Sequence, residues 1–251
     1  MGLRRLFGYH HQEAIKYFQK CQKLAPDCAL SYAFMALCHC PNYNFTGEAF
    51  YSSTHISDPS AYISSDADIA FKESYNPEEN DVFPCQESAF YYARMASEVV
   101  KRLSKENIRR KKRKSNSKSR KVIAISEKEC YIISAIQRLT KHPSVSPERS
   151  EECAGRPYAD FLSKVYRRYE HDPDIAYLYA ESLMNLNAWS LYEFPSAITR
   201  SPDVDETRRV LEKALVDYPD HAGLCHLYIH LCEMSPNPGA ALAACMPLRK
   251  K

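Results

Sequence analysis

The stretch HHQEAIKYFQKCQKLAPDCALSYAFMALCHCP, residues 10–41, decides the fold class. Its apolar and small residues recur at intervals of three and four, which is the spacing of one face of an α-helix. The pattern is interrupted at Pro26-Asp27, restarts at Ala29 and ends before Pro41. Because proline ends a helix, the stretch predicts two short helices joined by a tight turn. We therefore expect a helical hairpin at the start of the chain.

The same spacing returns near the other end of the chain, and a weaker copy ends at Pro173. The residues that carry the pattern are Ala14, Phe18, Cys21 and Pro26 in the first copy and Leu211, Ala214 and Pro219 in the second. A unit that recurs is the signature of a repeat architecture, in which each hairpin buries its apolar face against the next. The predicted fold class is all-α, an α-solenoid of helical hairpins.

The division of the chain follows its composition. Residues 1–45 form the N-terminal hairpin, and residues 46–84, rich in Ser, Asp, Asn and Pro, form a long irregular insertion. Residues 85–104 are predicted to be helical, residues 105–121 to be a disordered basic linker, and residues 122–251 to hold the C-terminal repeats.

The basic linker concentrates the positive charge of a chain whose net charge is only +3. Its centre is RRKKRK, made of Arg109, Arg110, Lys111, Lys112, Arg113 and Lys114. Like charges at this density repel one another and stay hydrated, so we expect a solvated loop. It is either a tolerated insertion, or a nuclear-import signal or contact for nucleic acid or anionic lipid. Nucleic acid is expected as a partner only through this loop.

The amino-acid composition also indicates the compartment of the protein and whether it binds a cofactor. Ten cysteines without a C-x-x-C pair predict reduced thiols in a cytoplasmic or nuclear protein. No apolar run reaches the length of a membrane span, so no membrane partner is expected. Six glycines against fifteen prolines argue against a glycine-rich nucleotide fold, and no cofactor is expected.

Three polar side chains, His226, His230 and Glu233, are spaced to share one face of a helix. Two imidazoles and a carboxylate could bind a metal ion or form the centre of a metal-dependent or acid-base enzyme. Leu227 stands where the zinc-protease motif H-E-x-x-H has its glutamate, so that mechanism is not available. No other catalytic motif is present, and we expect a protein that is not an enzyme.

The repeated positions resemble the tetratricopeptide repeat. Four blocks extend the resemblance over roughly half of the chain: GLRRLFGYHHQEAIKYF, LAPDCALSYAFMAL, AYLYAESLMNLNAW and DYPDHAGLCHLYIHLCEMSPNP. They are similar to a poorly characterised branch of tetratricopeptide-repeat proteins with an H-x-Y-I-H block. Members of that branch continue with further repeats, whereas this chain ends at MPLRKK. The resemblance therefore implies a fragment of a longer protein or a divergent member.

The resemblance also implies a concave groove that binds a protein or peptide. The positions of this chain that match groove positions of the family are Tyr177, Ala180, Met184, Asn187, His226, His230 and Glu233. On this interpretation the chain is an interaction scaffold, with Tyr177 and Met184 as apolar anchors. The metal-dependent or acid-base enzyme and the nuclear protein presenting a basic loop remain alternatives.

Overall fold

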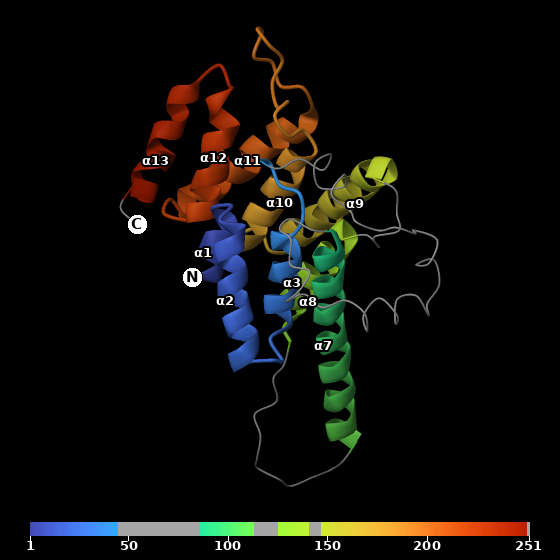
Figure 1. Ribbon diagram of the computed structural model, residues 1–251. Helices are drawn as coiled ribbons and strands as arrows, with labels where there is room; N and C mark the ends of the chain where they lie inside the picture. Colours follow the sequence, from blue (N-terminus) through green and yellow to red (C-terminus); the bar gives the residue numbers. More distant parts are fainter. Residues whose placement is uncertain (45–85, 113–124, 141–146, 250–251) are drawn as a thin grey trace.

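The computed structural model describes residues 1–44, 86–112, 125–140 and 147–249, and these form an all-α fold (Figure 1). The helices are α1 (Gly2–Phe7), α2 (His11–Leu24), α3 (Ala29–Cys38), α7 (Gln86–Lys112), α8 (Glu127–Leu139), α9 (Pro147–Arg168), α10 (Pro173–Asn185), α11 (Pro202–Asp217), α12 (Ala222–Glu233), the 3-10 helix η2 (Pro238–Ala241) and α13 (Leu242–Arg249). None of the helices in these ranges is long and apolar enough to cross a membrane. The predicted insertion, residues 46–84, lies outside the described residues.

The three predicted helix-turn-helix units are present. Helix α2 packs on α3, α9 on α10 and α11 on α12, with a proline or a Pro-Asp turn at each connection. The helical signature positions face the interior, since Ala14, Phe18, Leu211 and Ala214 are buried and Cys21 is half-buried. The two signature prolines, Pro26 and Pro219, are exposed at the turns. Each unit also contacts its neighbours, so the buried residues form one continuous core.

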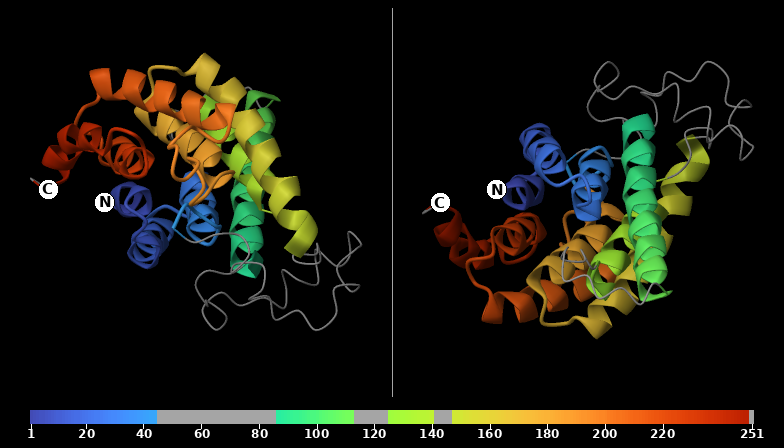
Figure 2. Two further views of the ribbon diagram at one scale, coloured as in Figure 1. Left: turned by 90° about the horizontal axis from the view of Figure 1, so that it is seen from above. Right: turned by 90° about the horizontal axis from the view of Figure 1, so that it is seen from below.

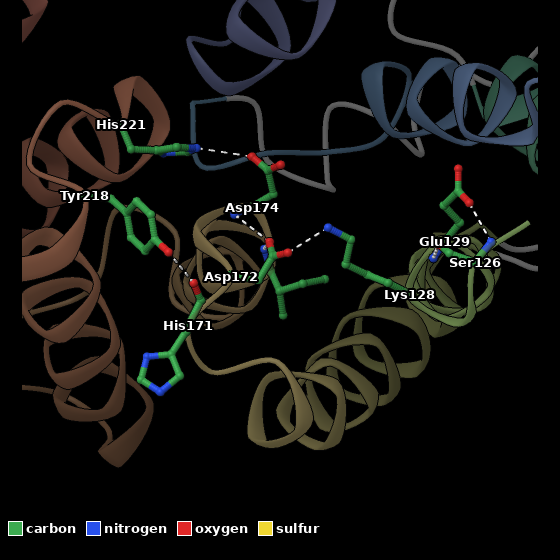
Figure 3. Close-up of polar contacts among 9 residues, drawn as sticks. Ser126, Lys128, Glu129, His171, Asp172, Asp174, Tyr218 and His221 are labelled. Atoms are coloured by element: carbon green, nitrogen blue, oxygen red, sulfur yellow. Dashed lines mark hydrogen bonds and ion pairs between the residues drawn. The ribbon is translucent and has the colours of Figure 1, made fainter.

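Polar contacts join the N-terminal ends of three helices (Figure 3). The Asp172 side chain caps α10 and also accepts a hydrogen bond of 2.7 Å from Lys128 on α8. His221 caps α12, because its Nδ1 accepts from the Leu224 amide at 3.1 Å, and its Nε2 donates to Asp174 at 3.2 Å. Each capping residue also links its helix to a neighbouring helix of the array.

The array curves so tightly that its two ends meet. Seen along the perpendicular direction (Figure 2), the helices follow a closed arc in which α1 lies beside α12. Helix α1 also contacts α2 and α3, so it is part of the first unit and of the closing contact at once. The concave centre of the array is therefore enclosed by helices from both halves of the chain.

The predicted start of the basic linker is wrong. Helix α7 does not end near residue 104 but continues to Lys112, so residues 105–112 are helical, and its lower end projects past its neighbours (Figure 1). Lysine and arginine are good helix formers, and cations are favoured near a helix C-terminus, which outweighs their mutual repulsion here. Arg113 and Lys114 lie outside the described residues.

Candidate functional site

The residues predicted to line a groove lie on two neighbouring helices, but most of them are covered. Tyr177, Ala180 and Met184 on α10 are 1%, 0% and 0% exposed. The prediction that these three form an open, partner-contacting surface is therefore wrong for this conformation. Asn187, which follows α10, is half-buried.

The α12 part of the predicted set is more accessible. His226 and His230 are half-buried, and Glu233 is exposed. We call the surface formed by these three residues together with Tyr177, Ala180, Met184 and Gly223 the α10–α12 face.

Part of the α10–α12 face, at Tyr177, Gly223 and His226, is covered by a segment of the same chain, residues 7–9. The Phe7 ring lies 4.1 Å from the Tyr177 ring and 5.6 Å from the His221 ring, measured between centroids. Gly223 makes this approach possible, because a Cβ at that position would lie 2.6 Å from Tyr177 Cδ2 and 2.9 Å from Phe7 Cβ. Phe7 is therefore seated in a slot whose back wall must be glycine.

Tyr9 covers the histidines beside that slot. Its ring centroid lies 4.7 Å from the His226 ring in an edge-on arrangement and 6.3 Å from the His230 ring. Tyr9 has a positive φ of 57°, a conformation that side chains other than glycine adopt at some cost. On the other side, Tyr43 packs on His230 at 5.0 Å. Aromatic rings from two segments thus enclose the histidine pair.

The two histidines form a chain of hydrogen bonds that ends on the covering segment. His226 Nδ1 lies 2.8 Å from the Phe7 carbonyl oxygen, His226 Nε2 lies 3.1 Å from His230 Nε2, and His230 Nδ1 lies 3.0 Å from Glu233 Oε1. A carbonyl and a carboxylate only accept, so both Nδ1 atoms carry protons, and one further proton lies between the two Nε2 atoms. The pair therefore holds three protons and one positive charge.

Burial acts on His226. It lowers the pKa of His226 below its ordinary value, which favours the neutral imidazole. The Nδ1 of this imidazole donates to the Phe7 carbonyl. The chain Glu233–His230–His226 orients one donor at a peptide carbonyl.

The same geometry bears on the metal hypothesis. Glu233 binds the Nδ1 side of His230, whereas His226 lies on its Nε2 side, so the three groups do not converge on one point. Across the described ranges, no group of three or more His, Cys, Asp and Glu side chains is arranged to hold a metal ion.

A buried polar cluster beneath the α10–α12 face was missed by the sequence analysis. Glu181 on α10 is 4% exposed, and burial raises the pKa of its carboxyl to about 7. Burial raises the pKa values of Tyr9, Tyr158 and Tyr177, and the negative charge of Glu181 raises them further. Within this cluster, four buried atoms meet no hydrogen-bond partner among the described residues. They are Tyr9 Oη, Tyr158 Oη, Glu181 Oε2 and Asn185 Oδ1.

A signal for this cluster was present in the sequence. Glu181 stands four residues after Tyr177 in the helix DIAYLYAESLMNL, on the same face and among apolar neighbours. A single acid in such a position is a candidate for a buried carboxyl.

No protein-family model, curated protein or solved structure matches this chain. The tetratricopeptide-repeat interpretation therefore rests on the residues quoted above and on their place in a curved array of paired helices.

Proposed function

We propose that this chain is a non-enzymatic scaffold whose α10–α12 face binds an extended peptide segment of a partner protein. The observation that carries the proposal is the way in which this face already holds residues 7–9. The Phe7 ring fills a slot against Tyr177, and the Phe7 carbonyl accepts a hydrogen bond from His226 at 2.8 Å. Side-chain pockets combined with hydrogen bonds to the main chain are a recurring way in which proteins recognise extended peptides.

The covering segment is small enough to be exchanged. Burying one phenylalanine side chain stabilises a contact by about 1.5–3 kcal/mol, and one hydrogen bond to a carbonyl contributes about 1 kcal/mol. A partner that offers the same groups can compete with residues 7–9 for the slot, because it displaces six residues of helix and a short turn rather than a repeat.

The compartment of this scaffold follows from its cysteines. Eight of the ten cysteines have described side chains, and these eight are free thiols, which supports a location in the cytoplasm or nucleus. The proposed binding needs no cofactor.

The experiment supplies the segment as a separate peptide. A fluorescent peptide with the sequence of residues 1–11, MGLRRLFGYHH, is titrated into the full chain carrying Phe7→Ala and Tyr9→Ala. We expect saturable binding to this variant and at least tenfold weaker binding to the wild-type chain, whose own segment occupies the face. Phe194→Ala is the matched control in the protein, because Phe194 is 91% exposed and is not one of the residues of the α10–α12 face.

The control in the peptide is the same sequence with alanine at positions 7 and 9. Equal affinity of the parent and alanine peptides, or no binding to a variant that is folded by circular dichroism, would contradict the proposal. His226→Ala in the receiving chain should weaken binding, since it removes the donor to the peptide carbonyl.

A further inference from the structure

The buried polar cluster around Glu181 forms the floor beneath residues 7–9. This acidic floor has more hydrogen-bond acceptors than residues 7–9 satisfy. Glu181 Oε2, Tyr158 Oη and Asn185 Oδ1 are buried and meet no hydrogen-bond partner in the described structure, although Asn185 also lowers the pKa of the Glu181 carboxyl. The carboxylate and amide oxygens accept only, and the Tyr158 phenol can accept as well as donate. The covering segment brings the phenol of Tyr9, which has one O–H to donate and does not reach any of these three atoms. Buried polar atoms are normally paired, so this floor is arranged for a group with more donors.

The chemistry of that group follows from the atoms present. An ammonium group carries three N–H donors and a positive charge, which matches three acceptors of which one belongs to a carboxylate. An extended lysine side chain has about the reach of tyrosine, so a lysine at the position of Tyr9 would bring its ammonium to the same depth.

An ion pair between the ammonium group of the ligand and the Glu181 carboxylate is favourable because Glu181 is already buried. Glu181 has already lost its water in the folded protein, being 4% exposed, so the cost of dehydrating the carboxylate is not incurred again on binding. Only the incoming ammonium has to be dehydrated, and an uncompensated buried carboxylate is the situation in which a partner charge is worth most.

We propose that the natural ligand of the α10–α12 face is a peptide with an aromatic residue at the position of Phe7 and a lysine two residues later, whose ammonium pairs with Glu181. This inference rests on the proposed function, because it concerns the ligand of the same face. Residues 7–9 of the chain are then an internal ligand that fills the aromatic slot and leaves the acidic floor unpaired.

The test compares three peptides on one receiving chain. The receiver is the full chain with Phe7→Ala and Tyr9→Ala, or with Tyr9→Ala alone should the double variant fail to fold. The peptides are residues 1–11 with tyrosine, lysine or methionine at position 9; methionine controls for length without charge. Titrations are run at pH 8, where a carboxyl with a pKa of about 7 is ionised.

We expect the lysine peptide to bind about tenfold more tightly than the methionine peptide. Glu181→Gln in the receiver should abolish the difference, whereas Glu193→Gln, at an exposed position, should not. If the tyrosine peptide binds but lysine brings no gain over methionine, the acidic floor is not a lysine site and the proposed function stands. If none of the peptides binds, both proposals are overturned.

Discussion

At the scale of single residues, Glu181 makes the stability of the fold depend on pH. Its carboxyl has a pKa of about 7 in the folded protein, against an ordinary value of 4.5. Between pH 4.5 and pH 7, the Glu181 carboxyl is protonated in the folded protein but ionised in the unfolded chain. The free energy of unfolding therefore falls as pH rises from 4.5 to 7 and is level above that window.

Glu181→Gln should remove this dependence, because glutamine fills the same space without ionising. We expect the variant to match the wild-type chain at pH 4.5 and to exceed its stability by up to about 3 kcal/mol at pH 8, at 1.4 kcal/mol for each pKa unit. Urea unfolding at a series of pH values measures the difference. The exposed control Glu193→Gln should follow the wild-type curve, and a constant offset at every pH would count against the assignment.

His11 should give the opposite slope. Burial lowers its pKa to about 4, and its Nδ1 donates to the Cys38 carbonyl at 2.9 Å, so the folded protein holds it neutral. Between pH 6.5 and 4 the unfolded chain takes up a proton that the folded protein does not, and stability is lost as pH falls. In His11→Gln, the loss of stability between pH 6.5 and 4 in urea titrations should be smaller than in the wild-type chain.

Sequence spacing predicted which side chains share a face but not what they face. The histidines and Glu233 lie three and four residues apart, and the structure joins them into one hydrogen-bonded chain. Their partner, the Phe7 carbonyl, is 219 residues away from His226 in the sequence. Helical periodicity is local and holds no information about such a distant segment, so the covering of Tyr177 could not be predicted.

At the scale of elements, α7 is the helix whose extent was underestimated. Along its exposed side, Lys101, Lys105 and Arg109 follow one another at intervals of four residues, which places like charges on adjacent turns. The charge density was correctly identified in the sequence, but its consequence for secondary structure was not. Repulsion between exposed cations costs only a few tenths of a kcal/mol per pair, less than helix propensity supplies over the same turns.

Lys105→Glu should stabilise the projecting end of α7, since it converts two repulsive pairs into attractive ones. We expect amide hydrogens at residues 106–109 to exchange about fivefold more slowly at low salt, corresponding to roughly 1 kcal/mol. Raising the salt concentration to about 0.5 M should remove most of the difference through screening. Lys20→Glu on α2 serves as the control, and exchange in α7 that is unchanged by Lys105→Glu would contradict the explanation.

At the scale of the whole molecule, the closing contact between α1 and α12 depends on one missing methyl group. Gly223→Ala would place a Cβ 2.6 Å from Tyr177 Cδ2 and 2.9 Å from Phe7 Cβ, so a ring or the whole of α1 has to move. We expect a loss of roughly 1–3 kcal/mol from overpacking, reduced by about 1 kcal/mol from the better helix propensity of alanine.

Limited proteolysis and urea unfolding measure the two consequences, release of residues 1–9 and loss of stability. Gly155→Ala on α9 is the matched control, because its Cβ would meet only the flexible end of Leu186 at 3.0 Å. Protection of residues 1–9 in Gly223→Ala equal to that in the wild-type chain would show that the slot tolerates a side chain.

The overall architecture was predictable only in part. The recurring pattern around Pro26, Pro173 and Pro219 predicted paired helices in an array, and the structure has them. How sharply an array curves depends on the angles between successive units. The contacts between units include Lys128–Asp172 and His221–Asp174, which join residues 44 and 47 positions apart and which no short sequence pattern reports.

The contact between α1 and α12 can form only late in the synthesis of the chain. Phe7 and the histidine that binds its carbonyl are 219 residues apart, so this is a contact of very high sequence separation. At a synthesis rate of roughly 5–20 residues per second, the nascent chain waits on the order of ten to forty seconds before His226 exists. Throughout that delay the rings of Phe7 and Tyr9 have no slot to enter, and they stay exposed until the partner helices of this contact have been made.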